Sequence, residues 1–104
     1  MPSAAIARRD LIGKRKDGSV FDISVRIGTP YEVDGVSWAC PVAVDGIDHS
    51  LADQHGIDSW QALLLAISLV RSRLEHFIET GGKLYWRDDP LIEVHLRDIF
   101  GNDT

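Results

Sequence analysis

Residues 58–82 read DSWQALLLAISLVRSRLEHFIETGG, and this stretch decides the fold because it carries the signals of one long helix. Asp58 is a favoured N-cap residue type, and Gln61 stands three positions later, where a capping-box partner belongs. Gly81 and Gly82 close the pattern, as glycine commonly does at a helix C-terminus. The sequence therefore predicts a helix over residues 59–80.

One stripe of this helix is apolar and is expected to cover a core. With side chains turning about 100° per residue, six apolar residues share a face. They are Leu63, Ala66, Ile67, Val70, Leu74 and Phe77. The opposite face is mainly polar, so the helix is expected to bury one stripe against a sheet.

Two further leucines, Leu65 and Leu69, fall off that stripe, and Ser72 and His76 continue their line. Trp60, in the first turn, is a candidate for the rim of a contact surface. Three explanations stay open for the leucines. The C-terminal segment covers them, a second subunit or another protein binds them, or they are single exposed leucines, which soluble proteins tolerate.

Before the helix, residues 20–28 alternate apolar and polar side chains, which is typical of a half-buried strand. Residues 6–13 form the expected partner strand, because Asp17-Gly18 between them favours a turn. A three-residue loop would place Leu11 opposite Ile23 and Arg9 opposite Val25; a two-residue loop would shift this pairing by one residue. Both registers set a charge against an apolar row, which predicts an edge strand.

A second hairpin is expected around Asp45-Gly46, with strands over residues 36–44 and 47–52. A two-residue turn there pairs Cys40 with Leu51. The resulting core face carries Trp38, Cys40, Val42, Val44, Ile47 and Leu51. Pro41 cannot donate a backbone hydrogen bond, so it indicates a bulge or an unpaired edge.

After the helix, residues 83–86 predict a fifth strand. Asp89-Pro90 favours a short helix with Ile92, Leu96, Ile99 and Phe100 on one side, although the alternation from Ile92 to Leu96 also fits a strand. Residues 101–104 are expected to fray. The prediction is one α+β domain over residues 1–104: an antiparallel meander of four to five strands, one long helix packed on one face, and a short C-terminal helix.

Composition narrows the functional classes. The net charge of −5 disfavours nucleic acid as a partner, because phosphate binding needs clustered lysine and arginine. No apolar run approaches the roughly 18 residues that a membrane helix needs, and the N-terminus lacks signal-peptide features. The single cysteine, Cys40, excludes an internal disulfide and fits a reducing compartment, so a cytoplasmic location is expected.

The residues that could carry chemistry gather weakly around the second hairpin. His49, Asp53 and His55 are candidate ligand-binding residues, with Cys40 as a possible nucleophile. The predicted register points His49 inward beside Val42 and leaves His55 beyond the strand. These groups do not converge there, so no catalytic residue, metal ligand or cofactor is predicted.

Three segments resemble one family. Residues 57–63 read IDSWQAL, residues 81–86 read GGKLYW, and residues 38–41 read WACP ahead of Asp45-Gly46. Together they resemble an uncharacterised family of small bacterial proteins, with similarity over residues 6–86. The resemblance implies a bacterial source and an accessory role, and it brings no established activity.

The sequence therefore favours a non-enzymatic protein-interaction or accessory domain that forms a homodimer or binds another protein. The candidate interface residues are Leu65, Leu69, Ser72, His76 and Trp60. One alternative is a small-molecule binder or enzyme that uses the Cys40, His49, Asp53 and His55 region. Another alternative is an immunity-type protein that neutralises a toxin, because such proteins are often small, acidic and α+β.

Overall fold

The structure is a computed structural model that describes residues 5–48 and 51–101. Its strands are β1 (Ala5–Lys14), β2 (Val20–Gly28), β3 (Tyr31–Val33), β4 (Ser37–Cys40), β5 (Val42–Asp45), β6 (Gln54–Gly56), β7 (Lys83–Trp86) and β8 (Glu93–Val94). Its helices are α1 (Ser59–Glu79) and α2 (Leu96–Phe100). This confirms the α+β class, with a long helix on an antiparallel sheet and a short C-terminal helix.

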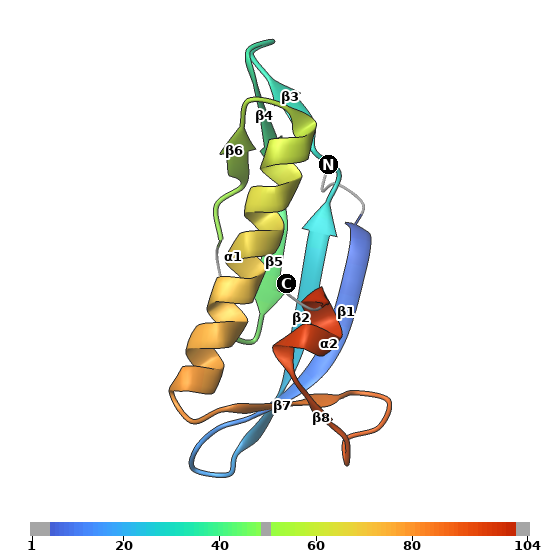
Figure 1. Cartoon of the computed structure of the whole chain (residues 1–104), viewed down its shortest axis with the longest axis vertical. Helices are drawn as coiled ribbons and strands as arrows, with labels where there is room; N and C mark the ends of the chain where they lie inside the picture. Colours follow the sequence, from blue (N-terminus) through green and yellow to red (C-terminus); the bar gives the residue numbers. More distant parts are fainter. Residues whose placement is uncertain (1–4, 49–50, 102–104) are drawn as a thin grey trace.

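The strands divide between two sheets, where a single meander was expected. The larger sheet has the order β5-β2-β1-β7-β8, and the smaller has the order β3-β4-β6. Figure 1 shows α1 lying along both, with its N-terminal end beside β4 and β6 and its remaining turns over β5 and β2. One helix thus ties the two sheets together.

The first hairpin takes the register of the three-residue loop. Leu11 lies opposite Ile23, and Arg15 N donates to Ser19 O at 2.8 Å, which closes the loop. The prediction that β1 is an edge strand is wrong for its second half, because β7 pairs with Leu11–Lys14 after the chain returns from α1. Residues 5–10 of β1 have no described strand on the side away from β2.

The second hairpin differs most from the prediction. The strand breaks at Pro41: β4 joins the smaller sheet, while β5 pairs with β2 in the larger one. The partner of β4 is β6, which sets Cys40 opposite Gln54 where Leu51 was expected. Near the turn, Val44 bridges Asp48, so the loop is one residue longer than predicted. The predicted pairing of His49 lies outside the described residues.

The ends of α1 follow the sequence signals. Asp58 Oδ1 accepts from Gln61 N at 2.8 Å, and Gln61 Oε1 accepts from Ile57 N at 2.7 Å. At the other end Gly81 takes a positive φ of 99°, and Gly82 N donates to Phe77 O at 3.0 Å, which is a Schellman ending. Side chain and backbone therefore fix both ends of the helix.

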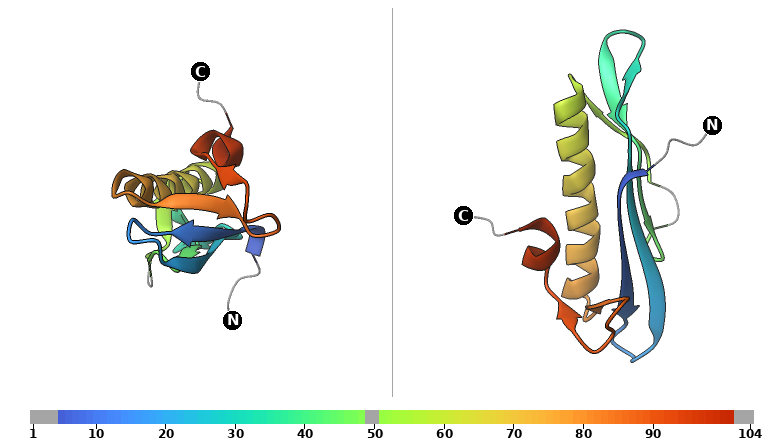
Figure 2. Two further views of the ribbon diagram at one scale, coloured as in Figure 1. Left: turned by 90° about the horizontal axis from the view of Figure 1, so that it is seen from below. Right: turned by 90° about the vertical axis from the view of Figure 1, so that its right-hand side faces the viewer.

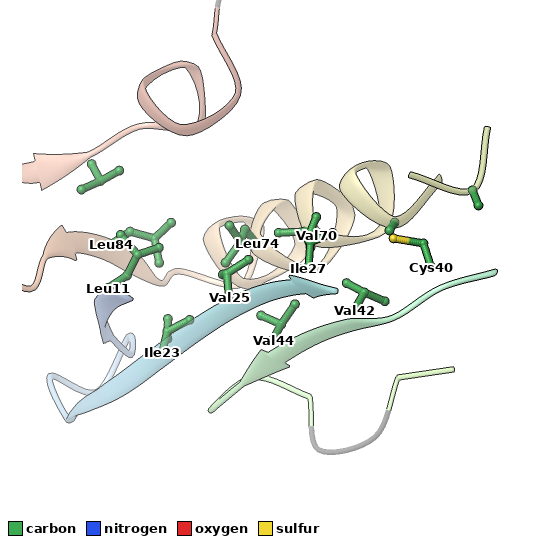
Figure 3. Close-up of a cluster of buried hydrophobic side chains, with 13 residues drawn as sticks. Leu11, Ile23, Val25, Ile27, Cys40, Val42, Val44, Val70, Leu74 and Leu84 are labelled. Atoms are coloured by element: carbon green, nitrogen blue, oxygen red, sulfur yellow. The ribbon is translucent and has the colours of Figure 1, made fainter. Parts of the chain in front are cut away.

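The core lies between α1 and the face of the larger sheet that α1 covers (Figure 3). Its fully buried large side chains include Leu11, Ile23, Val44, Val70, Leu74 and Leu84. Cys40, Val42 and Val44 are buried and Trp38, Ile47 and Leu51 pack against them, so the predicted core face is confirmed even though its pairing is not.

The C-terminal segment combines the two predicted alternatives. Residues 93–94 form β8 beside β7, and residues 96–100 form α2. Asp89-Pro90 opens a turn and no helix, with Ile92 N donating to Asp89 O at 3.0 Å. His95 N donates to Asp98 Oδ2 at 2.8 Å and caps α2. Of the predicted frayed residues 101–104, Gly101 is described and its N–H donates to Arg97 O at 2.9 Å, whereas residues 102–104 lie outside the described part of the chain.

Candidate functional site

The predicted ligand-binding residues are not brought together among the described residues. Tyr31 Oη donates a hydrogen bond to Asp53 Oδ2, while His55 is an exposed β6 residue opposite Ala39. His49 lies outside the described residues. Residues 5–48 and 51–101 hold no group of three or more His, Cys, Asp or Glu side chains that could bind a metal ion.

Cys40 is a buried structural thiol. Its side chain is fully buried, and Sγ lies 3.5 Å from Gly28 O. Burial raises the pKa of the Cys40 thiol, and the negative charge of Asp53 adds to this effect. A nucleophilic cysteine needs the opposite shift, so the geometry gives Cys40 no catalytic character.

The predicted interface residues of α1 divide into two groups. Leu65 is exposed, as are Ser72 and His76, whereas Leu69 packs against the core. Trp60 is 71% exposed. The partial burial of Leu69 arises because the core contact of α1 is wider than the predicted stripe.

The C-terminal segment covers the flank of α1 that lies opposite the flank of Leu65. Ile99 and Phe100 of α2 lie beside Leu64, Ile67 and Arg71 of α1. Leu65 is about 200° around the helix from Ile67 at ideal geometry. Of the three explanations left open for the off-stripe leucines, cover by the C-terminal segment is therefore wrong for its described part, because α2 packs on the other flank of the core stripe.

This placement of α2 leaves an apolar groove that is bounded by α1, α2 and the β1–β2 part of the sheet. Figure 2 shows α1 and α2 on the same side of the sheet formed by β1 and β2, above the strands in the left view and to their left in the right view. The floor of the groove is formed by Ala7, Val25 and Ile27, and one wall by Leu63, Ile67 and Val70. Ile99 and Phe100 form the opposing wall.

The mouth of the groove lies along β1. Ile6, Arg8 and Arg9 complete the lining, and the groove has a volume of about 390 Å³. Nine of its eleven lining residues are apolar. Exposed Leu64 borders the neighbouring hollow, which shares Ile67, Ile99 and Phe100 with the groove. The apolar surface thus continues from the groove onto the outside of α1.

Along this mouth, residues 5–10 of β1 have a free edge, in the sense that no strand within residues 5–48 and 51–101 pairs with them on the side away from β2. In an antiparallel ladder, successive residues point their backbone groups alternately to the two sides. Arg15 bonds to Ser19 on the β2 side, so odd-numbered residues of β1 face β2 and even-numbered ones face away. β7 meets Ile12 and Lys14 on that outer side but ends at the level of Leu11. The N–H and C=O groups of Arg8 therefore point to the free side.

Three arginines lie at or beside the groove. Arg8 and Arg9 line it and Arg71 lines the adjoining hollow, and among the described residues neither lining includes an acidic side chain. Arg9 shares the face that α1 covers, whereas Arg8 lies on the other face of the sheet, opposite Arg26. Arg8 Nε is 3.0 Å from Asp10 Oδ1, and the Arg9 guanidinium lies 4.9 Å from the centroid of the Trp86 ring. The Arg71 guanidinium lies 5.7 Å from the Phe100 ring.

The opposite face of the sheet has its charges paired internally. Arg87 Nη2 lies 2.8 Å from Asp22 Oδ2, and Arg26 pairs with Asp45. The Arg8 hydrogen bond is the main cause that lowers the pKa of the Asp10 carboxyl. This face behaves as a solvated ion-pair surface, and the groove is the better candidate site.

Sequence reasoning missed the groove as a site. Its residues come from four elements, β1, β2, α1 and α2, which meet only through long-range packing. One signal was present in the sequence: Trp60, Leu64 and Arg71 flank the core stripe of α1 on one side. That side is where α2 docks.

Fold and site define a small α+β domain in which an apolar groove adjoins a free strand edge. A family model described as Domain of unknown function (DUF6968) matches residues 7–94, so the chain belongs to this family. This confirms the resemblance to an uncharacterised family and extends it past residue 86 into β8. No curated protein and no solved structure matched the chain. No helix in the described part of the chain is long and apolar enough to cross a membrane.

Proposed function

We propose that this chain is a non-enzymatic protein-interaction domain whose contact surface is the apolar groove beside the free edge of β1. One observation carries the proposal. An apolar groove of about 390 Å³ runs on to the half-exposed side chain of Leu64 on α1. Contiguous exposed apolar surface of this kind commonly marks a binding site.

The chemistry of the lining supports binding over catalysis. Among the described residues that line the groove, Arg8 and Arg9 are the charged ones. Arginine stays protonated and orients anionic groups, and acid–base or nucleophilic catalysis needs groups that titrate or attack. The groove is therefore suited to hold a partner.

Self-association is a second form of the same proposal, and the exposed side chain of Leu65, on the other flank of α1, favours it. The groove itself suits a second copy poorly. A two-fold contact along β1 that is centred on Arg8 would set this arginine against Arg8 of the other copy, and one centred on Arg9 would do the same for Arg9. Like charges facing each other destabilise a strand pair.

The proposal also places the protein in a bacterial cytoplasm as an accessory factor. The family resemblance supports the source, and the single free thiol of Cys40 supports a reducing compartment.

The test is selection of linear peptides from a random display library on the intact chain. Each selected peptide is then measured on Leu64→Glu and on the matched control Leu65→Glu. The two leucines are neighbours with similar exposure, 50% and 40%, but of the two only Leu64 lines the hollow that adjoins the groove. We expect peptides that bind the wild type and Leu65→Glu alike and lose at least about tenfold in affinity on Leu64→Glu, a loss of about 1.4 kcal/mol.

Peptides that bind all three proteins equally would remove the groove as the contact surface. Light scattering on the same proteins tests self-association. A wild-type dimer that Leu65→Glu converts to folded monomers would support an α1 interface, and a wild-type monomer would end the homodimer form of the proposal.

A further inference from the structure

We infer that the groove receives an extended segment of another protein, with alternating apolar and acidic side chains, which adds a strand to the free edge of β1. The inference rests on the proposed function and names the chemistry of the partner. Three observations carry it: the open backbone groups at Arg8, the one-sided apolar floor beside them, and the concentration of arginine at this edge.

The free edge determines the conformation of the partner. The N–H and C=O groups of Arg8 point away from β2 in the ladder, and β7 does not extend to them. An extended chain laid beside residues 5–10 satisfies such groups with main-chain hydrogen bonds, whatever its sequence. In Figure 1 this length of β1 runs along the side of the sheet, above the level of β7.

The two faces of the sheet beside that edge determine the pattern of side chains along the partner segment. Ala7 and Arg9 lie opposite Ile27 and Val25, on the face that α1 covers, whereas Arg8 lies opposite Arg26 on the other face. An added strand therefore turns every second side chain towards α1 and α2. Ala7 is small, so the groove floor leaves room for a larger apolar side chain from the partner.

The arginines determine the charge of the partner's other side chains, those that point away from α1 and α2. The β1–β2 register sets Arg8 directly opposite Arg26, and like charges in that position destabilise a strand pair. Arg26 is paired with Asp45 and Arg8 with Asp10, yet the Arg8 side chain stays 56% exposed. An acidic side chain at the neighbouring position of an added strand reaches Arg8 and reduces this repulsion.

The probe is a synthetic peptide of alternating glutamate and leucine, capped at both ends and carrying a fluorophore. Three peptides serve as controls: lysine in place of every glutamate, the same composition with the leucines in one block, and N-methylation of alternate backbone amides. Binding is measured by fluorescence anisotropy, and amide NMR shifts of the intact chain locate it.

We expect the alternating acidic peptide to bind and to shift the amides of Ala7, Arg8 and Ile67. N-methylation of the edge-facing amides should abolish binding, because a methylated nitrogen cannot donate. Arg8→Glu should weaken the acidic peptide about two- to fivefold, in line with a cross-strand charge pair. The lysine peptide should bind Arg8→Glu better than the wild type, and Lys83→Glu, remote from the groove on β7, should change neither affinity.

Several outcomes would overturn the inference while leaving the proposed function in place. The lysine or block peptide could bind the wild type as well as the acidic one, or N-methylation could have no effect, while groove amides still shift. A wild-type dimer that Leu64→Glu dissociates would also overturn it, because a second copy would then occupy the groove. If no peptide perturbed the groove amides, including the peptides from the display selection, both the inference and the proposed function would be overturned.

Discussion

Arg9 stands opposite Val25 in the β1–β2 ladder, on the core-facing side of the sheet, and its guanidinium lies 4.9 Å from the centroid of the Trp86 ring. A charge in an apolar row is tolerated here because Arg9 is exposed at the mouth of the groove. The aromatic face of Trp86, next to it on the neighbouring strand, gives the cation a favourable partner.

Replacing Arg9 with alanine should lower the free energy of unfolding by about 0.5–1 kcal/mol, the range of an exposed cation–π contact. Urea denaturation followed by far-ultraviolet circular dichroism measures this loss. Arg97→Ala, on the exposed surface of α2, is the matched control and should stay close to the wild type. Equal stability of Arg9→Ala and wild type would show that the contact contributes nothing.

Removing the N-cap of α1 should destabilise the whole domain. Asp58 Oδ1 accepts from Gln61 N at 2.8 Å, and loss of such a cap costs about 0.5–2 kcal/mol. Asp58→Ala should therefore unfold at lower urea concentration with an unchanged denaturant slope, whereas Asp58→Ser should recover most of the loss. If the serine variant were as unstable as the alanine variant, the cap would not be the cause.

The thiol of Cys40 should react only when the domain opens. The thiol is fully buried, which limits the access of reagents, and burial raises its pKa, which lowers the fraction of reactive thiolate. Ellman's reagent should label native protein at least about a thousandfold more slowly than protein in urea, reflecting the folded-to-unfolded ratio of a small domain. Ser72→Cys in a Cys40→Ala background provides an exposed thiol for comparison. Rapid labelling of native Cys40 would contradict its burial.

The hydrogen bond from Tyr31 to Asp53 predicts a pH dependence in the alkaline range. This bond is the main cause that raises the pKa of Tyr31 above its usual value. A raised folded-state pKa gives stability that is complete below the unfolded value, about 10, and is lost as the pH rises through the folded value. Tyr31→Phe should therefore lose less stability above that pH than the wild type.

Absorbance titration at the tyrosinate band measures the Tyr31 pKa directly, with Tyr31→Phe used to subtract the signal of Tyr85. Asp53→Asn should move the Tyr31 pKa back towards its usual value. An identical titration of the wild type and Asp53→Asn would mean that the two side chains do not interact in solution.

The elements that sequence reasoning placed well are those with local signals. The helix is bounded by Asp58 and Gly81, whose cap and positive φ act within one turn. The strand at residues 83–86 follows directly from that ending. In the first hairpin the loop sets the register, and of the two registers considered the structure adopts the one with Arg9 opposite Val25.

The predicted pairing of the second hairpin was wrong because the actual partners of its strands are distant in the sequence. Asp45-Gly46 does form a turn, but Val42 pairs with Ile27 of β2, and the returning chain pairs with β4 only at Gln54–Gly56. The sequence at Pro41 indicated a break without showing which sheet each half would join. The groove was missed for the same reason, since the docking of α2 against Ile67 depends on tertiary packing.

The free edge of β1 also affects the tendency of the protein to aggregate. An open strand edge is a template on which further copies can stack into aggregates, and native proteins block this with charges and bulges. Here the ladder is irregular between Ala5 and Ala7, and Arg8 and Arg9 follow at once. These are the kinds of feature that oppose stacking of identical strand edges, so the residues next to the groove also act against self-templated aggregation along β1.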